Sequence, residues 1–270
     1  MRQALIIPGD SDRRSAVGQP RAGGKTVKSK INGIIRPVRR ELPAYLREVY
    51  SWAYLNPRNA RLLDNEVVVN TILWGNSGRL RRALLAEITA GDRVLQAAHV
   101  YGRMIPDLAR AIGPQGGLDV VEIAPLQAAL CRRKLRGFTN AQVHIGDASC
   151  AGKGGYDVAI SFFLLHELPN TYKRKVVNAL LARISPGGKA VFIDYSKPVS
   201  WHPLRNLMQL IFTRFEPFAR NMWQHQIQDF ACDAKSYSWH TETYFGGNNN
   251  NRGNNCRSRW CWPACRDCGG

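Results

Sequence analysis

The chain has 270 residues, a mass of 30.3 kDa and a formal net charge of +18, a size that suits one large domain or two small ones. Its residues are 44% hydrophobic and 21% charged, which excludes a chain that is disordered or fibrous throughout. The longest apolar stretches run to about seven residues, whereas a transmembrane helix needs ~20. We therefore expect a folded domain and no segment that spans a bilayer on its own.

Much of the positive charge lies near the two ends of the chain. Residues 1–40 carry ten Lys or Arg against two Asp, and residues 248–270 carry four Arg against one Asp. The middle, residues 41–247, keeps 24 basic and 17 acidic residues, a surplus of +7. This moderate surplus is compatible with a nucleic acid, an anionic membrane or no partner. A nucleic-acid-binding module would need basic and aromatic residues interleaved on one face, so we expect no nucleic-acid partner.

The first ninety residues divide into two parts. Residues 1–40 show no periodic apolar pattern and predict a flexible basic arm, in which Asp10 and Asp12 argue against an organellar presequence. Residues 41–90 contain apolar residues at helical spacing and predict a helical lead-in to the main domain.

The cysteines separate the end of the chain from the rest. Cys131, Cys150 and Cys232 are scattered singly, as in the reduced thiols of an intracellular protein. The other four, Cys256, Cys261, Cys265 and Cys268, lack the paired spacing that is usual in structural zinc sites. The segment 248–270 also contains a run of Asn followed by Arg, Trp and Gly. This composition predicts a disordered tail, and it resembles the product of translation in a shifted reading frame.

Strands and helices alternate between residues 91 and 247. The expected strands are Arg93–Ala98, Leu118–Ala124, Ala141–Asp147, Asp157–Phe163, Lys189–Tyr195 and Ser236–Phe245, and the expected helices are Ile105–Ile112, Leu126–Leu135, Lys173–Ile184 and an amphipathic piece over Leu204–Phe230. A turn is expected at Ser185–Gly188. This alternation predicts an α/β domain with a doubly wound, mostly parallel sheet. Right-handed crossovers would then place a ligand at the carboxyl ends of the strands.

Two acidic residues end neighbouring predicted strands. Glu122 ends the second strand, where a carboxylate can accept hydrogen bonds from both ribose hydroxyls of an adenosine. Asp147 ends the third strand and is the second such acid. A single strand-end acid is often only a helix cap, but two at this interval favour an adenosine-containing cofactor, either NAD or S-adenosylmethionine.

Two segments carry a family resemblance. The stretch Ile184–Pro198, with its Ser-Pro-Gly-Gly turn and following strand, closely resembles the fifth-strand region of the ubiquinone/menaquinone C-methyltransferases, and Asn70–Gly75 resembles the segment before their first strand. This resemblance implies the class I S-adenosylmethionine-dependent methyltransferase fold, with a seven-stranded sheet, a helical N-terminal extension and a cofactor-binding domain over residues 91–247. In that family the position of Asp147 addresses the adenine amino group.

The loop after the first strand departs from that family. It reads Gln96-Ala97-Ala98-His99-Val100-Tyr101-Gly102, where the methyltransferases are glycine-rich so that the nucleoside can approach the backbone. This loop, together with Phe162–Pro169 and with Tyr50–Pro57, Cys131–Gly137 and Phe215–Ala219, resembles one offshoot, the rhodoquinone biosynthesis enzymes. The likeness runs from about Glu41 to Gly247. A damaged methyltransferase is the alternative interpretation of the altered loop.

The resemblance to this offshoot implies an unusual reaction. Its members convert ubiquinone to rhodoquinone, exchanging a ring methoxy group for an amino group, with S-adenosylmethionine as the implied nitrogen donor and Mn²⁺ assisting. We would then expect a cytoplasmic protein, peripheral on the inner membrane, or on the matrix side in a mitochondrion. The competing enzyme hypothesis is an ordinary methyltransferase acting on a quinone or another small molecule.

The resemblance and the predicted strand ends together give a set of candidate site residues. The expected catalytic residues are His99, Tyr101 and His166; those expected to contact the cofactor are Gln96, Ala97, Gly102, Glu122, Ile123, Asp147, Ala148 and Phe163; and those expected to bind Mn²⁺ are His166, Glu167 and Asp194. His99 could equally be a packed histidine in a tight turn, Glu167 a cap of the next helix, and Asp194 a residue that serves only the backbone. The stretch Leu204–Trp223 is either a helix that covers the core or an interfacial helix on a membrane.

Overall fold

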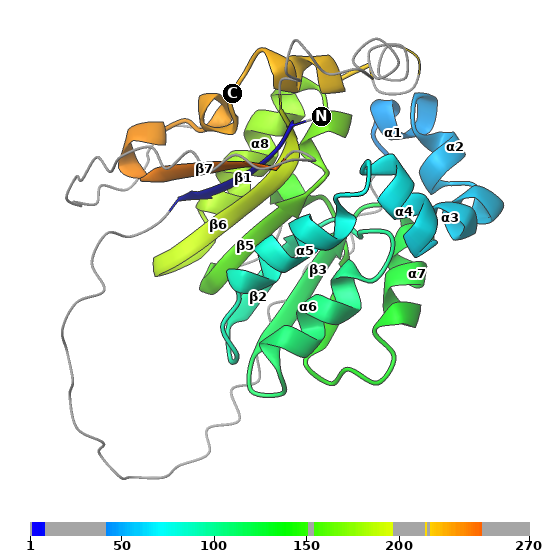
Figure 1. Ribbon diagram of the computed structural model, residues 1–270, viewed down its shortest axis with the longest axis horizontal. Helices are drawn as coiled ribbons and strands as arrows, with labels where there is room; N and C mark the ends of the chain where they lie inside the picture. Colours follow the sequence, from blue (N-terminus) through cyan, green and yellow to red (C-terminus); the bar gives the residue numbers. More distant parts are fainter. Residues whose placement is uncertain (1, 9–41, 151–153, 197–213, 215–216, 245–270) are drawn as a thin grey trace.

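The computed structural model describes residues 2–8, 42–150, 154–196, 214 and 217–244 (Figure 1). Within these residues seven strands form one sheet in the order β4-β3-β2-β5-β6-β1-β7. Their bounds are β1 Arg2–Pro8, β2 Arg93–Ala97, β3 Gly117–Glu122, β4 Ala141–Ile145, β5 Tyr156–Phe162, β6 Ile184–Ser196 and β7 Trp239–Tyr244. The strands expected between residues 93 and 195 are confirmed, and the last expected strand is β7.

The strand order creates a switch point at β2. Strands β2 to β6 run parallel to their neighbours, and the chain leaves β2 toward β3 on one side while β5 pairs on the other. In such sheets ligands bind outside the carboxyl ends of the strands at the switch point. The loops that follow β2 and β5 therefore frame the place where a site is expected.

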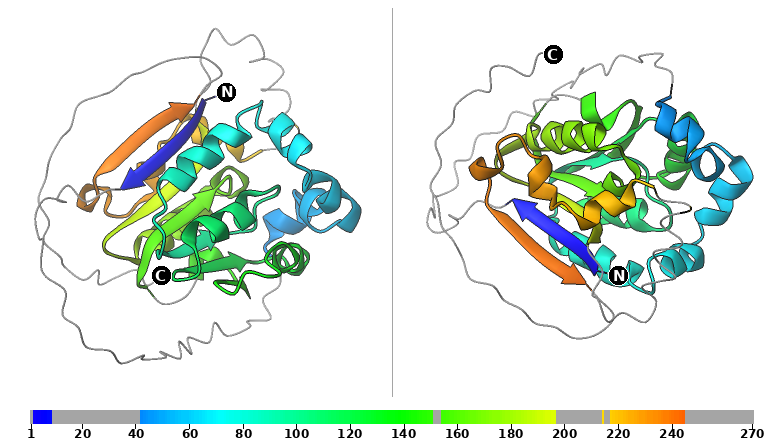
Figure 2. Two further views of the ribbon diagram at one scale, coloured as in Figure 1. Left: turned by 60° about the horizontal axis from the view of Figure 1, so that its bottom comes forward. Right: turned by 90° about the horizontal axis from the view of Figure 1, so that it is seen from above.

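Helices cover both faces of this sheet (Figures 1 and 2). Leu80 and Leu84 of α5, Ile105 and Leu108 of α6, and Cys131 of α7 pack on one face. On the other face Val177 and Leu180 of α8 pack with Met222 and Phe230. The bounds are α5 Ser77–Ala86, α6 Met104–Ile112, α7 Pro125–Lys134 and α8 Asn170–Leu181. The sheet is doubly wound, as expected.

The predicted helical lead-in consists of short helices that precede β2. They are α1 Ala44–Glu48, α2 Ser51–Tyr54, α3 Pro57–Leu63 and α4 Glu66–Ile72, followed by α5. Side chains cap two of them: Asn56 accepts from the N–H of Arg58 at 2.9 Å, and Asn65 accepts from Val67 at 2.8 Å. Pro57 at the first turn of α3 has no N–H to leave unpaired. The short helices turn repeatedly and lie beside the carboxyl ends of the strands (Figure 1).

Strand β1 corrects the expectation for the first residues of the chain. Arg2–Pro8 pair antiparallel with β6 on one side and with β7 on the other. The expectation of a flexible arm over residues 1–40 therefore does not hold for these seven residues, and residues 9–41 lie outside the described part. The pattern was missed because a lone strand is defined by its partners, which here lie at the other end of the sequence.

Two further local expectations were wrong. The expected turn at residues 185–188 is part of β6, where the register with β5 shifts between Tyr156 and Val158 and Gly187 has a φ of 77°. Of the helix expected over 204–223, Arg214 is helical, whereas the described end forms a turn at 217–218 and a 3-10 helix over Ala219–Trp223. A second 3-10 helix, Ile227–Phe230, follows. Most of 204–216, and all of the tail 248–270, lie outside the described residues.

Two expectations made from composition can be compared with the described residues. Cys131, Cys150 and Cys232 are free thiols. Among the helices that the structure describes, none is both long and apolar enough to cross a bilayer.

Candidate active site

The end of β2 directs the chain into the loop over residues 98–103. Ala98 has a φ of 65°, an unusual value for a residue with a side chain, and its N–H donates to the carbonyl of Val121 at 2.9 Å. The side-chain amide of Gln96 donates to the carbonyls of Ala97 at 2.7 Å and Ala98 at 3.2 Å. Gln96 thus holds the loop backbone, while its buried Oε1 has no hydrogen-bond partner among the described residues.

His99 is a buried, neutral imidazole whose tautomer is fixed by its neighbours. Gln127 uses its amide nitrogen to donate to the Tyr54 carbonyl and the Tyr101 hydroxyl, both at 2.9 Å. Its oxygen therefore accepts from Nδ1 of His99, 3.0 Å away, and Nδ1 carries the proton. Burial and the charge of Lys134 lower the pKa of His99 to about 3. Nε2 keeps its lone pair and has no hydrogen-bond partner among the described residues.

Tyr101 ties the loop to the helical lead-in. Its hydroxyl donates to the carbonyl of Ala53 at 3.0 Å, and its ring stacks on that of Tyr54 with centroids 5.8 Å apart and planes 16° from parallel. Tyr54 in turn donates to the carboxylate of Glu167. Burial raises the pKa of Tyr101 well above its usual value, so this residue is a protonated phenol.

Lys134 and Asp64 clamp the loop from two other elements. The ammonium of Lys134, on α7, forms an ion pair with Asp64 and donates to the carbonyls of Val100 at 3.2 Å and Gly102 at 2.8 Å. Asp64 also accepts from the N–H of Gly102 at 2.9 Å. Gly102 has a φ of 76°, and a Cβ there would lie 2.6 Å from Oε2 of Glu66. The positive φ favours glycine here, and a Cβ would displace the carboxylate of Glu66.

Glu122 lies directly beneath the loop. Its two oxygens accept the N–H groups of His99 at 2.8 Å and Ala124 at 2.7 Å. Burial raises the pKa of Glu122 to about 7, against the lowering effect of these N–H groups. The carboxyl is therefore balanced between its protonated and ionised forms near neutrality, in the position expected for a ribose-binding acid.

The hydroxyl of Tyr45 feels the negative charge of three carboxylates, which end or follow β3, β4 and β5. Burial, and then the negative charges of Asp147, Glu167 and Glu122, raise the pKa of Tyr45. The Tyr45 ring meets that of Tyr172 edge-on, with centroids 5.4 Å apart. Carboxylates grouped with phenol rings form a favourable environment for a cation. Tyr45 belongs to α1, so the lead-in completes this environment.

Three other residues expected at the cofactor lie in different surroundings. Ala97 is buried and packs in the core with Leu95. Ile123 and Ala148 are half-buried beside the two strand-end acids: Ile123 packs near Tyr50, and Ala148 packs against the core under α8. Ala97 is thus a core residue, whereas Ile123 and Ala148 lie where they could touch a nucleoside.

His166 and Asp194 form a buried pair at the ends of β5 and β6. Nδ1 of His166 lies 3.0 Å from Oδ1 of Asp194. Asp194 also accepts three backbone N–H groups, from Leu165 at 2.8 Å, His166 at 3.2 Å and Tyr195 at 2.7 Å. These four hydrogen bonds use the acceptor positions of both carboxylate oxygens. Nε2 of His166 lies 3.8 Å from Oε1 of Glu167.

The three residues expected to bind manganese come together, but their donor atoms do not fit a metal ion. The acceptor positions of Asp194 are occupied by N–H groups, and Glu167 accepts the hydroxyl of Tyr54. Across the described ranges, no group of three His, Cys, Asp or Glu has an arrangement that could hold a metal. Asp194 instead orients the imidazole of His166 and fixes the loop after β5.

Phe163 begins that loop and meets the same pair. It has a φ of 50°, and its N–H donates to the carbonyl of Ile193 at 2.7 Å. Its ring meets His166 and Tyr195 edge-on, with centroid distances of 5.9 and 5.0 Å. Phe163 therefore lies beside His166, just beyond the carboxyl end of β5.

Sequence analysis missed several residues that organise the site. Gln127 and Lys134 are seven residues apart on α7 and so share one helix face, a spacing that could have revealed them. Tyr45 and Tyr54 gave no such signal. Lys173 on α8 was also missed: it is buried, donates to the carbonyl of Phe218 at 2.9 Å, and has its pKa lowered to about 8 by burial.

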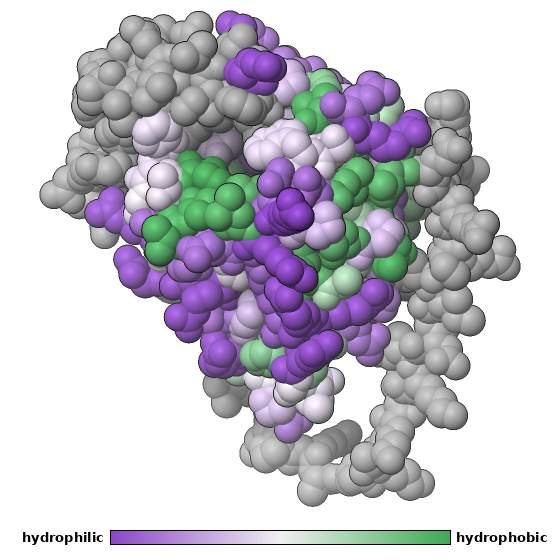
Figure 3. Space-filling model, turned by 90° about the vertical axis from the view of Figure 1, so that its right-hand side faces the viewer, coloured by the Kyte–Doolittle hydropathy of each residue, from purple (hydrophilic) through white to green (hydrophobic). Residues whose placement is uncertain are grey.

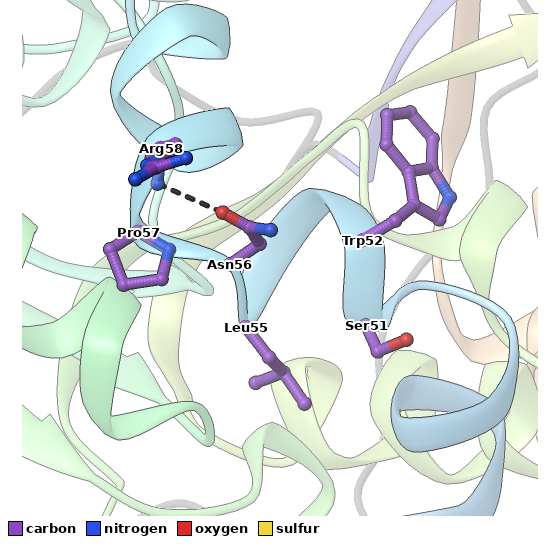
Figure 4. A pocket seen from close by; sticks show the side chains of 6 residues that line it. All are labelled: Ser51, Trp52, Leu55, Asn56, Pro57 and Arg58. Carbon is purple, nitrogen blue, oxygen red and sulfur yellow. Dashed lines mark hydrogen bonds between the residues drawn. The ribbon is translucent and has the colours of Figure 1, made fainter.

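An open hollow of about 640 Å³ lies on the lead-in, apart from these groups. Its lining residues, Ser51, Trp52, Leu55, Asn56, Pro57 and Arg58, come from α2 and the start of α3 (Figure 4). Polar groups here already serve the helices, since Asn56 caps α3. The hollow includes no residue expected in the site, and the convergent hydrogen bonds described above favour the strand ends instead.

Comparison with known sequences finds methyltransferases. The chain is 24% identical over 183 residues to the ubiquinone/menaquinone biosynthesis C-methyltransferase of Pseudomonas putida (strain GB-1), covering 65% of this chain and 70% of the relative. It is 30% identical over 115 residues to the protein-L-isoaspartate O-methyltransferase of Ignicoccus hospitalis (strain KIN4/I / DSM 18386 / JCM 14125), covering 42% and 52%. The match thus spans about half the length of the second relative. No protein-family model matches the chain.

Solved structures with a similar fold also include methyltransferases. The mitomycin 7-O-methyltransferase is 14% identical, with a TM-score of 0.47 over 62% of this chain and 48% of that one. A TehB-like S-adenosylmethionine-dependent methyltransferase from Corynebacterium glutamicum ATCC 13032 Kitasato is 15% identical, with a TM-score of 0.43 over 62% and 84%. The parallel, doubly wound sheet with its switch point at β2 is the fold of the class I S-adenosylmethionine-dependent methyltransferases, and the sequence relatives include enzymes of that class.

Proposed function

We propose that this protein is an S-adenosylmethionine-dependent transferase that converts ubiquinone to rhodoquinone, exchanging a ring methoxy group for an amino group. The observation that carries the proposal is the loop after β2. Where a methyl-transferring relative needs glycines, this loop presents a neutral imidazole, His99, whose Nε2 lone pair is buried and has no hydrogen-bond partner among the described residues. This lone pair can accept a hydrogen bond from the N–H of a nitrogen donor and so position it.

The strand ends suit the cofactor. Glu122 lies where a carboxylate would accept hydrogen bonds from the ribose, with Ile123 beside it, and Asp147 and Ala148 lie where the adenine would bind. The carboxylates around Tyr45 favour a sulfonium or ammonium cation. When bound, S-adenosylmethionine would supply the amino nitrogen. In the exchange this nitrogen would form a bond to the ring carbon, the methoxy group would leave as methanol, and water would cleave the bond between the nitrogen and the cofactor. Nε2 of His99 would accept a hydrogen bond from the nitrogen and hold it near the loop.

His166 is suited to the other half of the exchange. Its Nδ1 is held by Asp194, which fixes the ring and stabilises a proton on it. A methoxy group leaves more readily as methanol than as methoxide, so a proton donor is needed at the ring. We assign this role to His166, which follows β5 at the edge where the acceptor would lie.

A second candidate function is methyl transfer to the ring of a quinone. The observation that favours it is the sequence match to a ubiquinone/menaquinone biosynthesis C-methyltransferase. The two reactions share the fold and the cofactor. They differ in which atom of the cofactor reaches the acceptor.

An isotope experiment separates these reactions. The full chain is incubated with ubiquinone in detergent and with S-adenosylmethionine labelled with ¹⁵N at its amino group, with and without added Mn²⁺, and the quinones are analysed by mass spectrometry. We expect an aminoquinone that carries the label and lacks one methoxy group. A quinone that gains a methyl group would instead establish methyl transfer and contradict amination.

We also propose that the protein works as a peripheral protein on the cytoplasmic or matrix side of a membrane, where a polyprenyl quinone resides. The support is an apolar face on the lead-in. The exposed fractions of Trp52, Leu62, Val67 and Ile72 are 43%, 63%, 73% and 46%. Figure 3 faces this side of the molecule and shows hydrophobic patches among hydrophilic ones. Exposed apolar patches of this kind often mark protein or membrane contacts.

The charges on this face favour a membrane with anionic lipids. Asp64 forms an ion pair with Lys134, and Glu66 forms one with Arg81. Arg58 and Arg61 are exposed and form no ion pair with any described residue. The face therefore presents tryptophan, aliphatic side chains and uncompensated arginine, the combination found on interfacial helices.

A further inference from the structure

Four aromatic side chains from four separate segments meet beside His166. Trp74 precedes α5, Phe163 follows β5, Tyr195 lies near the end of β6 and Trp223 ends a 3-10 helix. Trp74, Phe163 and Trp223 pack against the buried pair of Tyr195 and Ala219. We call these four rings, with Ala219 beneath them, the aromatic cluster.

Two members of the cluster occupy backbone conformations that ordinarily require glycine. Trp74 follows the C-cap of α4 with a φ of 54°, at the position where helices usually end in glycine. The amide of Asn76 holds this turn by donating to the carbonyls of Leu73 and Trp74, both at 3.3 Å. Phe163 has a φ of 50°. Among the described residues, one other non-glycine residue has a positive φ: Ala98, the first residue of the loop over residues 98–103.

Strain of this kind persists where the surrounding structure over-determines it, and it clusters at functional sites. A glycine at position 74 would satisfy the backbone, so the fold alone gives no reason for an indole there. The large rings do not simply fill the core either, because Trp74, Phe163 and Trp223 all remain half-buried. The strained backbone at positions 74 and 163 therefore carries aromatic side chains that remain partly exposed.

The cluster adjoins the groups that surround the expected cofactor. The ring of Tyr195 lies 4.6 Å from that of His166, centroid to centroid. His166 neighbours Glu167, one of the three carboxylates that act on Tyr45. The segment that carries Ala219 and Trp223 is anchored from below by Lys173, which donates to the carbonyl of Phe218 at 2.9 Å. The cluster thus lies beside His166 and, through it, near the carboxylate of Glu167.

We propose that the aromatic cluster is the binding site for the flat ring of the acceptor, stacked against Trp74 and Trp223 and beside His166. Indole and phenol rings have negative faces, and offset stacking on them favours a planar, electron-poor ring. A quinone is such a ring, whereas its reduced hydroquinone form is electron-rich. This inference rests on the proposed function for the identity of the acceptor, and it assigns the residues that select the oxidised ring.

Calorimetric titration of the full chain with the tail-less head group of ubiquinone tests the site. We expect Trp74→Gly and Trp223→Ala each to raise the Kd roughly tenfold, as loss of a stacking partner should, and Trp223→Phe to restore most of the affinity. Trp239→Phe is the matched control, because Trp239 is half-buried on β7 and lies outside the cluster. The hydroquinone should bind more weakly than the quinone to the unmodified chain.

Thermal unfolding shows whether a variant loses quinone affinity because it no longer folds. Because position 74 has a positive φ, Trp74→Gly should be more stable than Trp74→Ala, while both lose quinone affinity. Equal quinone affinity in the unmodified chain and in the Trp74 and Trp223 variants would overturn the site even if labelled aminoquinone forms. Loss of affinity in those variants without any labelled product would keep the ring site and overturn the amination.

Discussion

His99 and Glu122 are joined by one hydrogen bond, yet burial shifts their pKa values in opposite directions. His99 falls to about 3, so the unfolded chain binds a proton that the folded chain does not, and stability rises with pH from 3 to 6.5 on its account. Glu122 rises to about 7, so the folded chain binds the extra proton, and stability falls from pH 4.5 to 7. Between pH 4.5 and 6.5 the two effects oppose each other.

Single substitutions should reveal these two opposing dependences of stability on pH. Relative to the unmodified chain, His99→Asn should lose stability as the pH rises from 3 to 6.5, and Glu122→Gln should gain it from 4.5 to 7, each by up to ~1.4 kcal/mol per pH unit. Urea unfolding over a pH series measures both differences. Differences that do not change with pH would contradict the assigned protonation states.

Turnover should depend on the lone pair of His99 but not on its protonation. Asn at position 99 can still donate to Gln127 but has no basic nitrogen, so His99→Asn should lower the amination rate by about 10²–10⁴-fold. Because the pKa of His99 is about 3, the ratio of rates should be the same at pH 6 and pH 8. His144→Asn is the matched control, since His144 pairs with Asp119 at 2.8 Å on the outer strands. An unchanged rate in His99→Asn would contradict the role of this lone pair.

The individual site residues were predictable only where strand position defined them. Glu122, Asp147, His166 and Asp194 were found because parallel strands end at one edge, which brings their last residues together. The role of Asp194 could not be found in this way, because it depends on which lone pairs its neighbours occupy. The tautomer of His99 likewise depends on Gln127, which is 28 residues away in sequence.

At the scale of elements, the loop over residues 98–103 is held by an ion pair from its neighbours. Side chains of Lys134 and Asp64 are 13% and 9% exposed, and breaking a buried pair by removing one partner costs about 3–5 kcal/mol. We expect Lys134→Met to destabilise the chain by that order and to speed hydrogen exchange at Gly102. Lys189→Met is the control: its pair with Glu87 is 31% and 24% exposed, and its loss should cost under ~1 kcal/mol. Equal effects would show that the clamp adds nothing.

Elements with a strong local period were predictable, and those defined by distant partners were not. The buried strands β2 and β5 and the helices α6 and α8 carry apolar residues at the expected spacing. Arg2–Pro8 has an apolar centre too, but its basic surroundings gave no sign of a partner. At residues 217–223 the apolar periodicity suggested the end of one helix, where tertiary packing produces a turn and a 3-10 helix.

For the whole molecule, the apolar face of α2–α4 should control attachment to a membrane. The pair Val67→Glu and Ile72→Glu introduces two charges where the exposed fractions are 73% and 46%, and should weaken binding to anionic vesicles at least ~10-fold. Ile145→Glu is the matched control, because Ile145 is 40% exposed but belongs to β4 and not to α2–α4. Vesicle flotation measures the bound fraction. Equal loss in both variants, or no loss, would contradict a membrane contact on this face.

The place of β1 in the sheet has a consequence for how the protein is made. Its partners β6 and β7 end at Ser196 and Tyr244, so the ribosome completes them long after Arg2–Pro8 has emerged. At ~5–20 residues per second, the wait before β7 is complete is roughly 10–50 s. During that time a strand with two open edges is free to pair wrongly. Of the seven described strands, β1 is the earliest in the sequence and among the last to be fully paired, and we expect nascent chains to depend on chaperones that shield β1.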